Sequence, residues 1–126
     1  MKNSNVNDDT ISILWTINSP LALIAINLSE NFSFITDKSI EHLCQCTNTP
    51  NLKSLNLADD CITDEGISKL ATSQCMSSLE ELILFGNSDI TSESMIMLGD
   101  SIWTKKLTKI DVHATSVDDQ GMFYLR

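Results

Sequence analysis

Four cysteines and two histidines are the side chains of this chain best suited to bind a metal or attack a substrate. Cys44 and Cys46 are separated by one residue, whereas zinc-binding cysteine pairs usually have two or more between them, and no histidine pair follows. His42 and His113 lie in no phrase typical of nucleophilic catalysis, and no glycine-rich phosphate loop is present. We therefore expect no catalytic site, metal or cofactor, and we expect free, buried thiols that include Cys44, Cys61 and Cys75.

Acidic residues are the second group of side chains that could bind a ligand, in their case a cation. Asp59 and Asp60, followed by Asp64 and Glu65, have the oxygen ligands of a cation site, but their order lacks the alternating aspartates and the glycine of a calcium loop. The chain has 17 acidic and 8 basic residues, a formal net charge of −9, and its one arginine is Arg126. The negative electrostatic field of such a chain repels nucleic acid and anionic membrane surfaces, so we expect neither as a partner.

A repeated sequence must build the frame that positions these side chains. The copy that begins at Leu52 has apolar residues at its first, fourth and sixth positions and then the phrase Ile-Thr-Asp-Glu-Gly-Ile at 62–67. Related copies begin at Leu23, Leu79 and Leu107, so the units are 27 to 29 residues long. Four copies in phase indicate a solenoid in which each unit packs against its sequence neighbours.

The pattern L-x-x-L-x-L-x-x-N, followed by I-T-D-x-G-[IL]-x-x-L, resembles the leucine-rich repeat family over about residues 21–126. The repeat length and the phrase at 62–67 are most similar to the ribonuclease-inhibitor-like and cysteine-containing subclasses. The resemblance implies a curved frame that binds proteins, and it names no partner. The asparagine that the family uses to form hydrogen bonds with the turn backbone is present as Asn31 and Asn87. Asp60 and Thr115 replace it in the other two copies and can form only some of these hydrogen bonds. The connection that follows Asn31, Phe-Ser-Phe at 32–34, is two residues longer than that of the second copy.

Each copy is expected to form one strand and one helix. The last two apolar positions of L-x-x-L-x-L are two residues apart, so they point to the same face of a strand. A helix-capping residue and then acids follow in each copy, the caps being Thr36, Thr63, Thr91 and Asp118. Apolar residues three apart then give each helix an inward face. We therefore predict an α/β fold, a short right-handed solenoid of about four strand–helix repeats with a parallel sheet on the concave face.

The strand positions that point away from the core form lateral rows across the copies. Most members are small or polar, as expected of a hydrated concave surface. Ile83 and Phe85 differ, because they are apolar, two residues apart and therefore on the same exposed face. Their polar neighbours are Glu81, Lys109, Asp111 and His113. We expect this group to bind a protein with Ile83 and Phe85 as anchors; the alternative is that Phe85 folds against a neighbouring loop.

The two ends of the repeat array differ in what covers them. We expect residues 1–20 to form a tail and a capping helix, and 21–126 to form the leucine-rich repeat domain. Asn18, Ser19 and Pro20 divide the apolar stretch at 11–28, which argues against a signal peptide or a membrane span. Solenoid ends normally carry a polar cap, but the last copy is expected to leave an open apolar end made of Ile110, Val112, Met122 and Phe123.

These features leave two functions open. The first is a non-catalytic interaction module, an adaptor or effector that binds another protein through the concave face. The second is a structural accessory subunit docked through the open end, where a weak homodimer is also expected. In both cases we expect an intracellular protein, cytoplasmic or delivered by a bacterium into a host cell, without membrane insertion.

Overall fold

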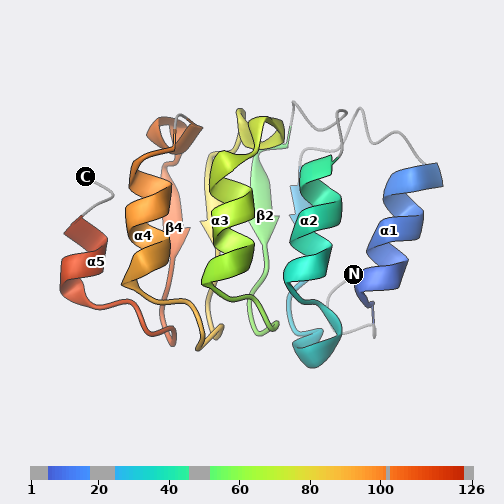
Figure 1. The fold of residues 1–126 in the computed structure, drawn as a ribbon, viewed down its shortest axis with the longest axis horizontal. Helices are drawn as coiled ribbons and strands as arrows, with labels where there is room; N and C mark the ends of the chain where they lie inside the picture. The colour runs from blue at the N-terminus through green and yellow to red at the C-terminus, as the bar shows by residue number, and fades with distance from the viewer. Residues whose placement is uncertain (1–5, 18–24, 46–51, 102, 124–126) are drawn as a thin grey trace.

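The computed structural model describes residues 6–17, 25–45, 52–101 and 103–123, and within them strands alternate with helices (Figure 1). The elements in chain order are α1 (Asp8–Ile17), β1 (Ala25–Asn27), η1 (Phe32–Phe34), α2 (Asp37–Gln45), β2 (Ser54–Asn56), α3 (Asp64–Thr72), η2 (Gln74–Met76), β3 (Glu81–Ile83), α4 (Ser92–Gly99), η3 (Trp103–Lys106), β4 (Lys109–Asp111) and α5 (Asp119–Phe123). The η elements are short 3₁₀ turns.

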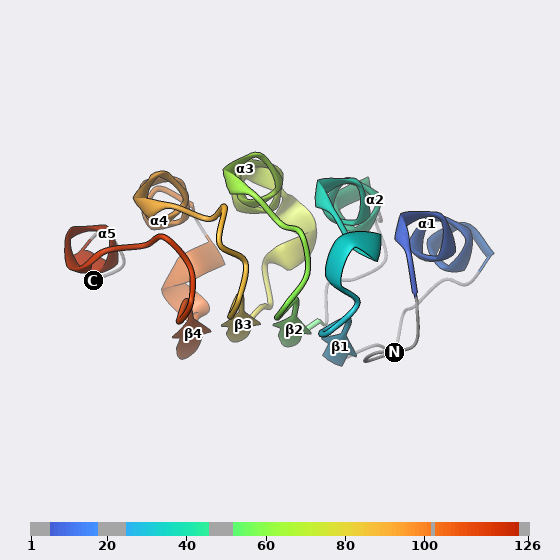
Figure 2. The ribbon, with the colours of Figure 1, turned by 90° about the horizontal axis from the view of Figure 1, so that it is seen from below.

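The strands form one parallel sheet in the order β1-β2-β3-β4. Figure 2 shows the strands on the inner side of an arc and the helices on its outer side. The register aligns equivalent positions of all four copies, so Ala25, Ser54, Glu81 and Lys109 are neighbours, as are Asn27, Asn56, Ile83 and Asp111. The predicted α/β solenoid with a parallel sheet is confirmed.

The core is a stack of aliphatic side chains between the sheet and the helices. Leu55 and Leu57 of the second copy, and Leu82 and Leu84 of the third, are completely buried. The helices contribute a matching row of buried residues at the predicted three-residue spacing: Ile40, Leu43, Ile67, Leu70, Met95 and Leu98. The outer copies have a neighbour on one side of the sheet, and there Ile26 and Ile110 are only half-buried.

A left-handed turn follows every strand. At the equivalent position of this turn, each copy has one residue with a positive φ: Glu30 at 62°, Asp59 at 53°, Gly86 at 80° and Ala114 at 56°. Its N–H donates to a carbonyl of the next copy, at 2.8 Å for Glu30 to Ala58, 2.7 Å for Asp59 to Phe85 and 3.0 Å for Gly86 to His113. Glycine adopts this backbone without strain, and at Gly86 the Asp59 carboxylate also occupies the space that a Cβ would need.

A ladder of hydrogen bonds joins the helix N-termini of neighbouring copies. Asp37, the first residue of α2, accepts the N–H of Thr63 at 2.9 Å and also the hydroxyl of Thr63. The same arrangement joins Asp8 to Thr36 and Asp64 to Thr91. Thr63 also caps its own helix by accepting the N–H of Glu65. Each carboxylate therefore lies at the positive end of the following helix and binds two adjacent copies together.

The ladder bonds lower the pKa of two of the carboxylates that accept them, Asp8 and Asp64. Burial raises the pKa of Asp64, but hydrogen bonds from Ser94 and Thr91 outweigh burial and hold the pKa below its usual value. The same balance of burial against hydrogen bonds lowers the pKa of Asp8. These links therefore stabilise the fold while the aspartates are ionised.

The last link of the ladder has its acid and its hydroxyl exchanged. Ser92 stands first in α4, where the earlier links have an aspartate, and Asp118 stands where they have a threonine. The Ser92 hydroxyl donates to Asp118 Oδ1 at 2.9 Å, and the Asp118 N–H donates to Ser92 Oγ at 3.2 Å. Asp118 Oδ1 also accepts the N–H of Gly121 at 2.8 Å. The exchange preserves one acid and one hydroxyl in the link.

Residues 6–17 take the place of the helical half of a further copy. Val6 is buried, and its N–H donates to Asn31 Oδ1 of the first copy at 3.1 Å. The same kind of bond joins the second copy to the third, where the N–H of Ile62 donates to Asn87 Oδ1 at 2.9 Å. α1 packs beside α2 at the end of the helix row (Figure 1), and Ile11 is buried against the core.

The prediction of buried thiols is wrong for Cys61, whose side chain is exposed, and Cys44 is half-buried. Asp60 and Ile62 are both buried, and side chains alternate along extended backbone, so Cys61 between them points outward. Cys46 and the side chain of Cys75 lie outside the described residues.

Candidate functional site

The predicted concave residues come from two neighbouring strands and the turns after them. Glu81 and Ile83 lie in β3, opposite Lys109 and Asp111 of β4 respectively. Phe85 and His113 occupy the matching positions in the following turns, where the N–H of Gly86 donates to the carbonyl of His113 at 3.0 Å. The structure therefore places these side chains on one patch, which we call the concave patch: Glu81, Ile83, Phe85, Lys109, Asp111 and His113.

Two polar pairs flank the apolar residues of the concave patch. Lys109 Nζ lies 3.7 Å from Glu81 Oε1, and both side chains are exposed, so the pair adds little stability. His113 Nδ1 lies 2.9 Å from Asp111 Oδ1, and the same oxygen accepts the N–H of His113 at 3.0 Å. That backbone hydrogen bond is the main reason why the pKa of Asp111 is lowered; burial opposes it, and the His113 ring and the Lys109 charge add to it.

Ile83 differs from its row neighbours in local chemistry. In the other copies this position carries a side-chain oxygen that accepts the N–H two residues later, at 3.0 Å each: Asn27 to Ser29, Asn56 to Ala58 and Asp111 to His113. Such bonds fix the turn after a strand. An isoleucine has no oxygen, so the third copy lacks this turn bond and has a half-buried apolar side chain in its place.

Phe85 is 40% exposed, and it is one of the exposed large apolar residues among those described, with Ile13, Phe32 and Phe34. An aromatic ring that keeps this much surface in contact with water has room to contact another molecule. The sequence pattern did not predict that Phe32 and Phe34 are exposed. The extra length of the connection in which both lie was the signal that could have identified them.

The predicted open end is only partly exposed. Ile110, Val112 and Met122 are half-buried and pack against the core, while the side chain of Phe123 lies outside the described residues. Within the described part of the chain, β4 is one of the two edge strands of the sheet and pairs with β3 alone.

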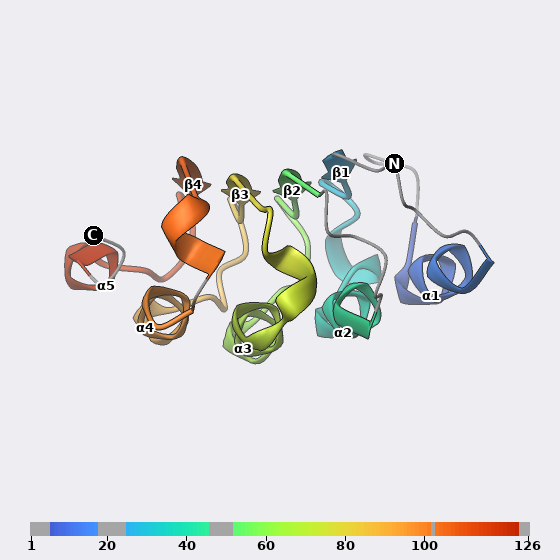
Figure 3. The ribbon, with the colours of Figure 1, turned by 90° about the horizontal axis from the view of Figure 1, so that it is seen from above.

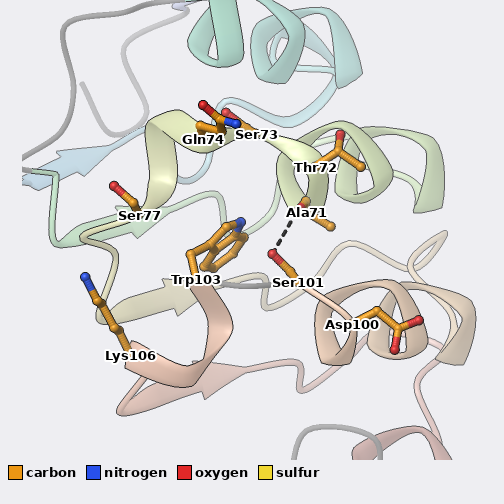
Figure 4. A pocket seen from close by; sticks show the side chains of 9 residues that line it. All are labelled: Ala71, Thr72, Ser73, Gln74, Ser77, Asp100, Ser101, Trp103 and Lys106. Carbon is orange, nitrogen blue, oxygen red and sulfur yellow. Dashed lines mark hydrogen bonds between the residues drawn. The ribbon is translucent and has the colours of Figure 1, made fainter.

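A groove of about 670 Å³ lies at the end of the repeats where helices lead into strands, the end that faces the viewer in Figure 3. Figure 4 shows the side chains that line it. Its lining includes Trp103 and Ser101 of the third copy. The Trp103 indole N–H donates to the carbonyl of Leu70 at 3.2 Å, and the Ser101 hydroxyl donates to that of Ala71 at 2.7 Å. Both side chains therefore satisfy carbonyls at the end of α3, which is a structural role.

Neither a metal centre nor a membrane span is recognised in the described ranges. No three histidine, cysteine, aspartate or glutamate side chains among those residues are grouped so that they could hold a metal ion. No helix among them combines the length and apolar character needed to cross a bilayer.

The comparison with known families bears on the repeats. Residues 48–71, which contain β2 and most of α3, match a family model described as Leucine Rich repeat. No curated protein matches the chain significantly. Repeats of this kind are generally non-catalytic and commonly mediate protein–protein interaction. The matched segment, together with the four-stranded parallel sheet and its alternating helices, supports a leucine-rich repeat protein with a short solenoid fold.

Proposed function

We propose that this protein is a non-catalytic interaction module, an adaptor or effector, that binds another protein through the concave patch. The observation that carries this proposal is the apolar pair Ile83 and Phe85 on the β3 side of that patch. Ile83 replaces the oxygen-bearing residue that fixes the turn in the other copies, and Phe85 keeps 40% of its surface exposed.

The surroundings of this pair suit an interface. Lys109, Asp111 and His113 line the β4 side of the pair, and Glu81 precedes it on β3. Apolar anchors beside polar rim residues are typical of binding hot spots. Burying the remaining surface of one such side chain contributes on the order of 1 kcal/mol. The rim then selects a partner by the position of its charges.

Three finer assignments belong to the same proposal. The repeat length and the phrase at 62–67 favour the ribonuclease-inhibitor-like or cysteine-containing subclass. The exposed thiol of Cys61 suits a reducing intracellular compartment. The first 20 residues serve as a tail and capping helix, an assignment that the packing of Ile11 and α1 against the first repeat supports.

A structural accessory role is the second candidate. It is favoured by the half-buried state of Ile110, Val112 and Met122 beside the edge strand β4. In that role a neighbouring subunit, or a second copy in a weak homodimer, covers these side chains.

A pull-down followed by titration tests the first candidate. Proteins retained by the wild-type chain are identified, and their affinity is measured for wild type, Phe85→Asp and Ile13→Asp. Ile13 is a matched control because it is an exposed aliphatic residue on α1 (57%), away from the concave patch. We expect Phe85→Asp alone to abolish binding while both variants keep the wild-type unfolding midpoint. Binding that survives in Phe85→Asp contradicts the proposal.

A further inference from the structure

Two exposed aromatic residues outside the concave patch lie on the η1 turn. Phe32 is 59% exposed and Phe34 is 49% exposed, so both rings project from the connection that is two residues longer than its counterpart in the second copy. The η1 turn lies at the end of the repeats where strands lead into helices, beside α2 in Figures 1 and 2. The left-handed turn after β3 follows at this same end.

The backbone of Phe32 is strained. Its φ is +46°, in the left-handed region that is unfavourable for a bulky side chain. A residue in that region is usually glycine or asparagine, and a strained aromatic with most of its ring in water brings the isolated fold no packing in return. Backbone strain at an exposed side chain points to a role outside the fold.

Hydrogen bonds place Phe32 close to Phe85 on the same edge. The N–H of Phe32 donates to the carbonyl of Asp59 at 3.0 Å, and the N–H of Asp59 donates to the carbonyl of Phe85 at 2.7 Å. Two such steps between neighbouring chains correspond to about 10 Å. The Asp59 carboxylate lies against the backbone of Gly86, directly after Phe85. An acid is therefore held between the two aromatic positions.

We propose that Phe32, Phe34 and Phe85 form one aromatic edge that binds a segment of a partner protein. That segment has two apolar side chains about 10 Å apart, the distance between residues i and i+7 on one face of a helix. A lysine or arginine between them faces Asp59. The inference deepens the proposed function, because Phe85 belongs to both surfaces, and it adds the partner's chemistry.

Charge favours a basic protein segment over a lipid surface. The chain has a net charge of −9, and Glu30 and Asp59 lie in the turns directly beside the aromatic residues. Such acids repel anionic headgroups and attract a cationic side chain.

Selection from a display library of random peptides of about 12 residues, long enough for an i to i+7 spacing, tests the proposal. Selected peptides are titrated into the full-length chain and into Phe32→Asn, Phe34→Ser, Phe85→Ser and the control Ile13→Ser. We expect peptides with two apolar residues and a basic residue between them, and affinity reduced about tenfold or more by each phenylalanine substitution but not by Ile13→Ser. Because asparagine tolerates a positive φ, Phe32→Asn should unfold at a higher urea concentration than wild type while it binds more weakly.

The outcomes separate this inference from the proposed function. If Phe85→Ser loses the peptides while Phe32→Asn and Phe34→Ser bind like wild type, the aromatic edge is refuted and the concave patch stands. If no peptide is selected, or none depends on any of the three phenylalanines, both fail. Phe32-dependent co-sedimentation with phosphatidylcholine–phosphatidylserine vesicles, without peptide binding, also refutes the protein partner.

Discussion

Replacing Asp60 by asparagine should stabilise the fold at neutral pH. Asp60 is buried, its Oδ1 accepts the N–H of Asn31 at 3.1 Å, and its Oδ2 is buried without a hydrogen-bond partner in the described structure. At the same position of the next copy, the Asn87 amide donates to the carbonyls of Leu57 at 2.8 Å and Leu84 at 3.0 Å. An asparagine supplies this donor at every pH, whereas an aspartate has a donor only when the folded chain binds a proton there.

The size of the effect follows from proton binding. Burial raises the pKa of Asp60 from 3.8 to about 8; the Asn31 N–H opposes the shift, and the charges of Asp59 and Asp8 add to it. The folded chain therefore holds a proton that the unfolded chain releases near pH 4. The contribution of Asp60 to the free energy of unfolding is therefore most favourable below about pH 4. It is lost as the pH rises toward 8, by up to about 1.4 kcal/mol per pH unit. Asp60→Asn should recover about 1–3 kcal/mol at pH 7, the range for a buried group without a partner.

Urea unfolding at pH 5, 6, 7 and 8 measures this prediction. The control is Asp59→Asn, which removes the same charge from the neighbouring residue, and asparagine tolerates the positive φ there. Wild type and Asp59→Asn should lose stability as the pH rises over this range, and Asp60→Asn should lose markedly less. Parallel pH profiles for Asp60→Asn and Asp59→Asn, or an Asp60→Asn variant that is less stable at pH 7, would refute the reasoning.

The remaining predictions concern the core, the ladder, the thiols and the edge strand. Leu57→Ala should lower the free energy of unfolding by about 2–5 kcal/mol. Thr63→Ala should lower it by about 1–2 kcal/mol, because a helix cap and a link to Asp37 are both lost. Equal losses for the two variants in urea titrations would contradict the strand register that buries Leu57. Below about pH 4, stability should fall as the ladder aspartates become protonated, and circular dichroism across an acid titration measures this. Cys61 should react rapidly with a thiol reagent in the native state, and slow modification would contradict its exposure. If the half-buried end self-associates, Val112→Lys should shift sedimentation toward monomer; a wild-type chain that is already monomeric at high concentration excludes the homodimer.

The sheet and the concave rows were predictable because an alternating pattern repeated in phase permits one register. A shift of one residue would turn Leu55 and Leu57 toward water, so their pattern also determines which side chains face outward, including Ile83 and Phe85. The patch could therefore be assembled from sequence positions alone. Whether it binds a partner is a matter that repetition does not encode.

The ladder and the strained turn were not predictable in the same way. Asp37 and Thr63 each have an ordinary local explanation as helix-end residues, and their bond becomes visible only when two copies are stacked. The stacking of copies also explains why the phrase at 62–67 contains a glycine. The Asp37 carboxylate of the preceding copy fills the space that a Cβ on Gly66 would need. The left-handed backbone of Phe32 opposes the preference of its residue type, so local propensity predicts the wrong conformation there.

The exchanged link between Ser92 and Asp118 means that the repeats are not interchangeable building blocks. Joining the second copy directly to the fourth would set Asp64 against Asp118, two carboxylates where the ladder needs an acid and a hydroxyl. Joining the first copy to the third would set Asp37 against Thr91 and preserve the link. Gene duplications or deletions in this array are therefore constrained by which unit follows which, and engineered shortening should tolerate removal of the second copy better than removal of the third.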